Sequence, residues 1–215
     1  YVLGREEPVT KPLALGKAVH KGIELIINKG LSLEEAVEAG LEEVEFHPEA
    51  NYREVYQLIK NAPVYQGMGE TEVHFQLPLE DSPDAPVIQG YIDLVMEGWI
   101  VDWKTNWKMY HIWDNHQIPL YAWVMMKLKG IPKINGSLYF LRHKESSIRT
   151  FTLENTKKSR KWAHDLAKEI EEKVSETKSD SVNRLFPARP SPYCKYCPFA
   201  LDCYKDSVEG AEIEG

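Results

Sequence analysis

The chain has 215 residues, 43% of them hydrophobic, which is enough for one globular domain with a sizeable core. No apolar run approaches the roughly 20 residues of a membrane-spanning helix and no secretory signal opens the sequence, so we expect a cytoplasmic protein without a membrane partner. The net charge of −7 excludes a surface that binds nucleic acid everywhere, but it is compatible with a local basic groove beside clustered acids.

The first predicted element is a helix over residues 13–29, where apolar residues recur at helical spacing and Gly30 is a natural stop. His20 lies on this helix, one turn after Gly16. A lone histidine on a helix is more often a packed or exposed bystander than a metal ligand. The spacing alone therefore assigns His20 no function.

Two further helices are predicted, over residues 32–46, which open with a capping box, and over residues 49–60. Neither carries evident chemistry. Residues 70–79 alternate between apolar and polar side chains, as in a half-buried strand. Glu72 lies on this strand, and a solvent-facing glutamate is as good an interpretation as a site residue.

The most informative stretch is residues 90–105, in which two apolar, β-rich runs flank a Glu97-Gly98 turn. Antiparallel pairing about this turn sets Asp93 opposite Asp102, where like charges are destabilising. Lys104 supplies one positive charge against two negative ones, and a divalent cation held by carboxylate oxygens would supply the rest. The alternative is a half-exposed hairpin with ordinary surface ion pairs. The predicted apolar face of the hairpin consists of Ile92, Leu94, Met96, Trp99, Val101 and Trp103.

After the hairpin, an aromatic link that contains Trp107, Tyr110 and Trp113 precedes a predicted helix over residues 115–129. Gln117 and Tyr121 fall four residues apart on one face of this helix. Without further context, Gln117 would be a helix cap and Tyr121 a core residue. Strands are then predicted over residues 134–141 and 148–153, and a charged helix over residues 156–177.

The three cysteines, Cys194, Cys197 and Cys203, all lie near the end of the sequence with the spacing C-x2-C-x5-C. This does not resemble a secreted disulfide framework. Packing of reduced thiols is one interpretation, and thiolate ligation of a metal is the other. Together, the elements predict an α/β fold with a mixed sheet of about five strands flanked by helices. We divide the chain into a core of residues 1–189 and a cysteine-containing tail, 190–215, packed on the core.

The hairpin motif GYID at 90–93, followed by VDWKT at 101–105, resembles the PD-(D/E)XK nuclease superfamily. These two motifs are most similar to those of its RecB-type branch, which includes CRISPR-adaptation nucleases with a cysteine-bound iron–sulfur cluster. Three further matches follow in the family's order: Gly16-x-x-x-His20, Gln117-x-x-x-Tyr121 and the cysteine tail. The resemblance spans most of the chain and implies a restriction-endonuclease-like core.

The resemblance implies that Asp93 and Asp102 bind Mg²⁺ or Mn²⁺, with His20 and the Trp103 carbonyl as further ligands, and that Lys104 is the catalytic lysine. It places Gln117 and Tyr121 in the active site and in contact with DNA. It also implies that Glu72 lies close to the site.

The cysteines match the C-terminal part of the family's iron–sulfur motif, which implies a 4Fe–4S cluster at Cys194, Cys197 and Cys203. The family's fourth cysteine lies upstream of the histidine helix, and this sequence has none. Either the segment that carries it is absent from the sequence, or the site is degenerate or has three ligands. Zinc is the second choice of metal.

The predicted function is metal-dependent hydrolysis of DNA, by an exonuclease of DNA repair, recombination or CRISPR adaptation, with single-stranded DNA as the favoured partner. The main alternative is a non-catalytic DNA-binding subunit that positions nucleic acid within a larger protein complex. A thiolate redox protein is a weaker alternative, because the cysteines occupy only the tail.

Overall fold

A computed structural model of the chain describes residues 9–177, 182–192 and 194–211. Lys11–His164 form one compact unit, and the chain from Asp165 onward belongs to a second one. Among the described residues, no helix is long and apolar enough to cross a membrane. The expected cytoplasmic location, the domain boundary at 189/190 and the packing of the tail on the core stay predictions.

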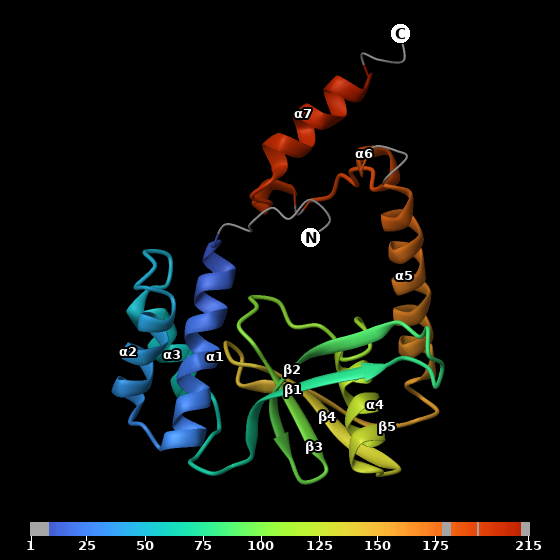
Figure 1. Cartoon of the computed structure of the whole chain (residues 1–215). Coiled ribbons are helices and arrows are strands. Elements are labelled where there is room, and N and C mark those ends of the chain that lie inside the picture. The colour runs from blue at the N-terminus through green and yellow to red at the C-terminus, as the bar shows by residue number, and fades with distance from the viewer. Residues whose placement is uncertain (1–8, 178–181, 193, 212–215) are drawn as a thin grey trace. The chain divides into compact units, whose positions relative to one another are not determined.

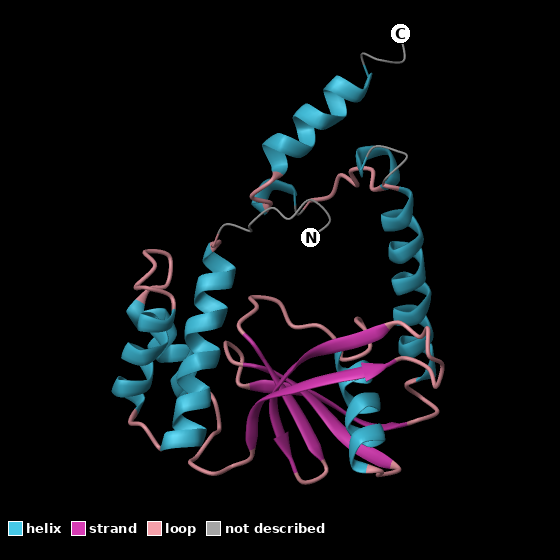
Figure 2. Cartoon of the chain, in the orientation of Figure 1, coloured by secondary structure: helices cyan, strands magenta, loops and turns pink. Residues whose placement is uncertain are grey.

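Within the described residues, five strands form one mixed sheet in sequential order β1-β2-β3-β4-β5 (Figure 2). The strands are β1 (Glu70–Pro78), β2 (Val87–Met96), β3 (Trp99–Lys104), β4 (Lys133–Phe140) and β5 (Glu145–Thr152). Neighbouring strands are antiparallel except for β3 and β4, which are parallel. The α/β prediction with a mixed sheet of about five strands is confirmed.

Helices cover both faces of this sheet (Figure 1). Three N-terminal helices, α1 (Lys11–Lys29), α2 (Leu33–Glu43) and α3 (Tyr52–Lys60), share one hydrophobic cluster with Leu94 and Val101 of the hairpin. On the other face, α4 (Gln117–Lys129) packs in a second cluster that includes Val95 and Ile100. Residues of β2 and β3 thus pack into two hydrophobic cores, one on each face of the sheet.

Local signals explain where these helices begin and end. Ser32 caps α2 in a complete capping box with Glu35, as predicted, and the side chain of Asn51 accepts two backbone N–H groups at the start of α3. Gly130 ends α4 with φ 63°, a left-handed conformation that glycine adopts without strain.

The hairpin follows the predicted register over its first pairs, in which Met96 faces Trp99 and Leu94 faces Val101. Gly98 has φ 71° in the turn. The ladder then ends, so the predicted Asp93–Asp102 pair does not form as a ladder pair. Tyr91, two residues earlier in β2, pairs only with His74 of β1.

One face assignment was wrong. Ile92 belongs to the α4-side cluster together with Val95 and Ile100, and not to the α1-side cluster that contains Leu94. The regular alternation of a strand is broken at this place. Glu72, which lies between the Thr71–Leu94 and Val73–Ile92 pairs of the β1–β2 ladder, has φ 49°, and Asp93 itself has left the β3 ladder.

The second unit is mainly helical in the part of it that the structure describes. The helix α5 (Lys157–Glu176) begins in the first unit and is followed by α6 (Val182–Leu185), a 3₁₀ turn η1 (Cys194–Tyr196) and α7 (Ala200–Ala211). Helix α7 was not predicted from the sequence. No glycine or proline interrupts residues 200–208, so helical propensity favours a helix there.

Candidate active site

The site is built where β2 separates from β3. Beyond Leu94 the two strands no longer pair, and the backbone N–H of Trp103 would be left without a partner on that side. The carboxylate of Asp93 takes that place and accepts the Trp103 N–H at 2.7 Å. The side chain of Asp93 is only 12% exposed, so its charge is held inside the opening of the hairpin.

His20 reaches this opening from α1. Its Nε2 lies 3.0 Å from the backbone carbonyl oxygen of Trp103, and its Nδ1 lies 3.5 Å from Asp93 Oδ2. A carbonyl oxygen can only accept, so Nε2 carries the proton and Nδ1 faces the carboxylate. Burial favours the neutral ring, but the Asp93 carboxylate, with smaller contributions from Asp102 and Glu72, raises the pKa of His20 to about 9.

Glu72 completes a group of ligand atoms with His20 and Asp93. One ligand atom from each residue lies within 4.8 Å of the other two. Partial burial and the charge of Asp93 raise the pKa of the Glu72 carboxyl. The sequence left Glu72 undecided between solvent and site; in the structure its side chain is exposed, yet it lies next to His20 and Asp93, between the Thr71–Leu94 and Val73–Ile92 pairs of the β1–β2 ladder.

Asp102 is 2% exposed, and Lys104 Nζ lies 2.6 Å from its Oδ2. Burial and the nearby charge of Asp93 raise the pKa of Asp102 to about 6, although Lys104 opposes the shift. Burial also favours a neutral Lys104, but Asp102 raises the pKa of the amine above its ordinary value. The two groups therefore form a buried ion pair that still carries the repulsion of a second carboxylate.

A chain of contacts extends from this ion pair to α4. Lys104 Nζ donates to Gln117 Oε1 at 2.9 Å, and Gln117 Nε2 donates to the Tyr121 hydroxyl at 3.1 Å. Gln117 is the first residue of α4, where Pro119 falls in the first turn, and the backbone N–H of Gln117 donates to Asn115 Oδ1. The structure thus brings together His20, Glu72, Asp93, Asp102, Trp103, Lys104, Gln117 and Tyr121.

A profile of the PD-(D/E)XK nuclease superfamily matches residues 1–204 of the 215. The chain belongs to the PD-(D/E)XK nuclease superfamily. A search of curated proteins found no match. Membership in this superfamily indicates a metal-dependent phosphodiesterase with a nucleic-acid substrate, and the mixed five-stranded sheet is consistent with its restriction-endonuclease-like fold.

The donor set of this superfamily member fits a divalent cation. Carboxylate oxygens are the ligands that Mg²⁺ and Mn²⁺ prefer, and a histidine nitrogen is compatible with Mn²⁺. Repulsion between Asp93 and Asp102 leaves an excess of negative charge that a cation would offset. The hydrogen bond from His20 to the Trp103 carbonyl orients the ring in the way that metal-binding histidines commonly require.

The cysteine tail shows no comparable arrangement. Cys194, Cys197 and Cys203 are exposed and form no disulfide bond. Across the described ranges, His20, Glu72 and Asp93 form the one group of three or more potential ligands, and it includes no cysteine. Among the described residues the three thiols are not gathered into one ligand group, so no chemical step is assigned to an iron–sulfur cluster.

Proposed function

We propose that the protein is a Mg²⁺- or Mn²⁺-dependent DNA nuclease of the RecB-like type, which removes nucleotides from DNA during repair, recombination or CRISPR adaptation. The single observation that carries the proposal is the convergence of a buried carboxylate (Asp102), a partly buried one (Asp93), a histidine and a lysine where β2 and β3 part. Superfamily membership supports nucleic-acid hydrolysis, and the choices of DNA, of exonuclease action and of the RecB-like branch are ours.

Asp93 and Asp102 would hold the cation, with His20 through Nδ1. Glu72 joins this set in our proposal because its carboxylate lies close to a ring nitrogen of His20 and to the carboxylate of Asp93. The Trp103 carbonyl, predicted as a ligand, has one lone pair engaged by His20, so orienting that ring is a second role for it. When bound, the cation would polarise the scissile phosphate and lower the pKa of an attacking water.

Lys104 is placed to act on the reacting phosphate or on the water. Its ammonium is held between Asp102 and Gln117, so its position is fixed before substrate arrives. A fixed positive charge in a mostly buried site stabilises negative charge that develops on a phosphate oxygen. Gln117 and Tyr121 extend the line of polar groups, and they would hold Lys104 and contact the DNA strand.

The proposed approach of the strand is supported by Gly16, one turn before His20. A Cβ added at Gly16 would meet nothing within 4 Å, so packing inside the protein does not require a glycine. Open space on the side of α1 that carries His20 suits the close passage of a substrate backbone.

The tail remains part of the proposal only as a site for thiolate chemistry at Cys194, Cys197 and Cys203. Its test is compositional. Protein purified without oxygen should carry iron and acid-labile sulfide with visible absorbance, or else zinc, and Cys197→Ser should lose that content. Metal-free protein under both conditions would contradict the thiolate site and leave the nuclease proposal untouched.

The test of the nuclease proposal is cleavage of end-labelled single- and double-stranded DNA in Mg²⁺, Mn²⁺ or EDTA. Asp93→Asn, Asp102→Ala and Lys104→Met should each lose at least about a hundredfold in rate. Glu97→Gln changes an exposed acid at the tip of the same hairpin and should cleave like the wild type. Binding of DNA without cleavage in every metal would favour the positioning subunit, and retained cleavage in the three variants would refute the assignment.

A further inference from the structure

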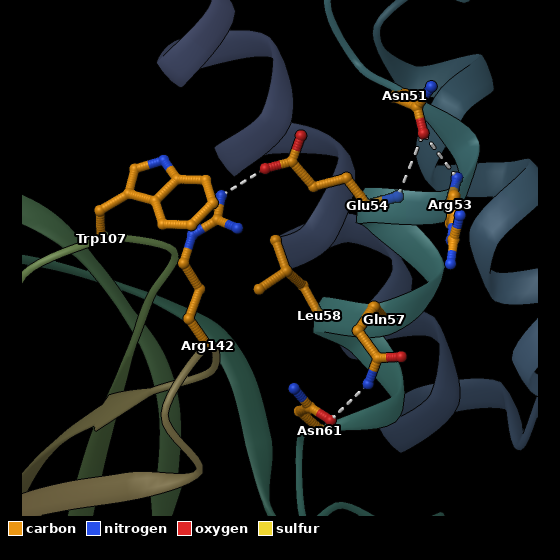
Figure 3. Close-up of a pocket in the computed structure, with 8 residues that line it drawn as sticks. All are labelled: Asn51, Arg53, Glu54, Gln57, Leu58, Asn61, Trp107 and Arg142. Carbon is orange, nitrogen blue, oxygen red and sulfur yellow. Dashed lines mark hydrogen bonds and ion pairs between the residues drawn. The ribbon is translucent and has the colours of Figure 1, made fainter.

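A pocket of about 450 Å³ lies between α3 and the segments that follow β3 and β4 (Figure 3). It belongs entirely to the first unit, Lys11–His164. None of the proposed metal ligands lines it. Its lining residues are Asn51, Arg53, Glu54, Gln57, Leu58, Asn61, Trp107 and Arg142.

The chain segment that follows β3 contributes an exposed tryptophan, Trp107, to the wall of this pocket. Trp107 is 76% exposed, so most of the indole surface is open to solvent. The guanidinium carbon of Arg142 lies 3.8 Å from the centre of the Trp107 ring, so one ring face is already covered (Figure 3). The indole is thus a supported platform with its remaining surface open.

The support under this platform is rigid. Arg142 Nε donates to the backbone carbonyl of Thr105 at 2.8 Å, and its Nη2 donates to Glu54 at 2.5 Å. The side chains of Arg142 and Glu54 are only 13% and 21% exposed. A guanidinium held at two points keeps a fixed plane, so the ring stacked on it is positioned before any ligand arrives.

The charge of the pocket differs in sign from that of the whole chain. Arg53 and Arg142 contribute two positive charges against one negative charge of Glu54, in a protein whose net charge is −7. Arg53 makes no side-chain hydrogen bond or ion pair with any residue that the structure describes. An aromatic platform beside an unengaged guanidinium is the combination by which proteins hold single-stranded nucleic acid.

The pocket adjoins the candidate active site through the backbone. The N–H of Leu141 donates to the carbonyl of Lys104 at 2.9 Å, and Arg142 then binds the next carbonyl, that of Thr105. Trp107 follows Lys104 by three residues, so their Cα atoms are at most about 11 Å apart. A strand whose phosphate lies at Lys104 can therefore place a neighbouring base over Trp107.

We propose that this pocket is a stacking site for one unpaired nucleobase of a single-stranded DNA substrate, with Trp107 as the platform, Arg142 and Glu54 as its positioning pair, and Arg53 facing the adjacent phosphate. The assignment rests on the proposed nuclease function. It extends that function by naming the substrate form, because a base inside a duplex is stacked and paired and cannot lie on the indole.

The test combines variants with DNA that lacks one base. Fluorescence anisotropy in EDTA would measure binding of a single-stranded oligonucleotide and of a set in which an abasic site moves along the strand. Trp107→Ala should weaken binding of the intact strand about tenfold, and Trp107→Phe should recover most of that loss. In the wild type, one abasic position should cost a similar factor. In Trp107→Ala the same position should cost nothing further.

The matched control is Tyr65→Ala, which removes an aromatic of 64% exposure outside the pocket and should bind like the wild type. Equal binding by wild type and Trp107→Ala, or equal loss at every abasic position, would overturn the stacking site. Cleavage in Mg²⁺ separates the two proposals. Wild type that neither binds nor cleaves DNA would refute the nuclease function itself, whereas active Trp107→Ala with unchanged affinity would refute only the stacking site.

Discussion

Metal affinity should rise steeply with pH, because a proton occupies the nitrogen that the metal needs. In the metal-free protein the pKa of His20 is about 9, against an ordinary 6.5, so the ring is protonated at neutral pH. A cation at Nδ1 must displace that proton. At pH 7.5 this displacement costs about 2 kcal/mol, at about 1.4 kcal/mol for each pH unit below 9.

The direction of the pH dependence and the pH range in which it appears both follow from the pKa of His20. Between pH 7 and pH 8.5 the apparent affinity for Mg²⁺ should increase about tenfold per pH unit, and the increase should level off above pH 9. Asp102, with a pKa of about 6, is already ionised throughout this window and adds little to the slope. His20→Gln removes the titrating group, so its affinity should be nearly independent of pH there.

Calorimetric titration with Mg²⁺ in two buffers of different protonation enthalpy measures the affinity and the number of protons released on binding. The wild type should release close to one proton per bound ion at pH 7.5, and His20→Gln should release none. Far-ultraviolet circular dichroism controls for folding. A wild-type affinity that changes less than about threefold between pH 7 and 8.5, or a slope shared with His20→Gln, would refute the reasoning that His20 exchanges a proton for the metal.

Two further outcomes are expected. In EDTA, the free energy of unfolding of the wild type should fall by up to about 3 kcal/mol as pH rises from 6.5 through 9. The reason is that the raised pKa of His20 stabilises the fold only while the ring is protonated. Denaturant unfolding measures this fall, and His20→Gln should lack it. Gly16→Leu should stabilise α1 by about 0.5–1 kcal/mol but lower DNA cleavage about tenfold, since its side chain would enter the space proposed for the strand. Full cleavage by Gly16→Leu would argue against that path.

The parts of the fold that follow local rules could be predicted from the sequence. The capping box at Ser32, the Glu97-Gly98 turn and the glycine stop at Gly130 depend on a few adjacent residues, and each stands as expected. The five strands were found within a few residues of their ends, because alternation and β-branched composition are also local signals. Helix α7 was not among the helices predicted from the sequence.

The departures at the site have a common physical origin. A strand's alternation predicts faces only while the strand stays in its ladder, and β2 leaves β3 at Asp93. Whether a strand separates depends on what satisfies the freed backbone, here the Asp93 carboxylate on the Trp103 N–H. This hydrogen bond is a tertiary contact that no local sequence pattern predicts. The wrong face assignment of Ile92 and the undecided role of Glu72 therefore both concern the place where Asp93 leaves the ladder.

The opening of the hairpin also explains how one small region keeps so much negative charge. A regular ladder would have faced Asp93 directly against Asp102, with β-carbons about 5 Å apart. In the structure each carboxylate has its own partner instead, the Trp103 N–H for Asp93 and Lys104 for Asp102. Burial and the charge of Asp93 raise the pKa of Asp102, and the attraction of the carboxylates for the protonated ring raises the pKa of His20. A divalent cation would offset the negative charge of Asp93 and Asp102 and would replace the proton on His20. The charged groups that repel one another in the free protein are therefore among those proposed to bind the metal.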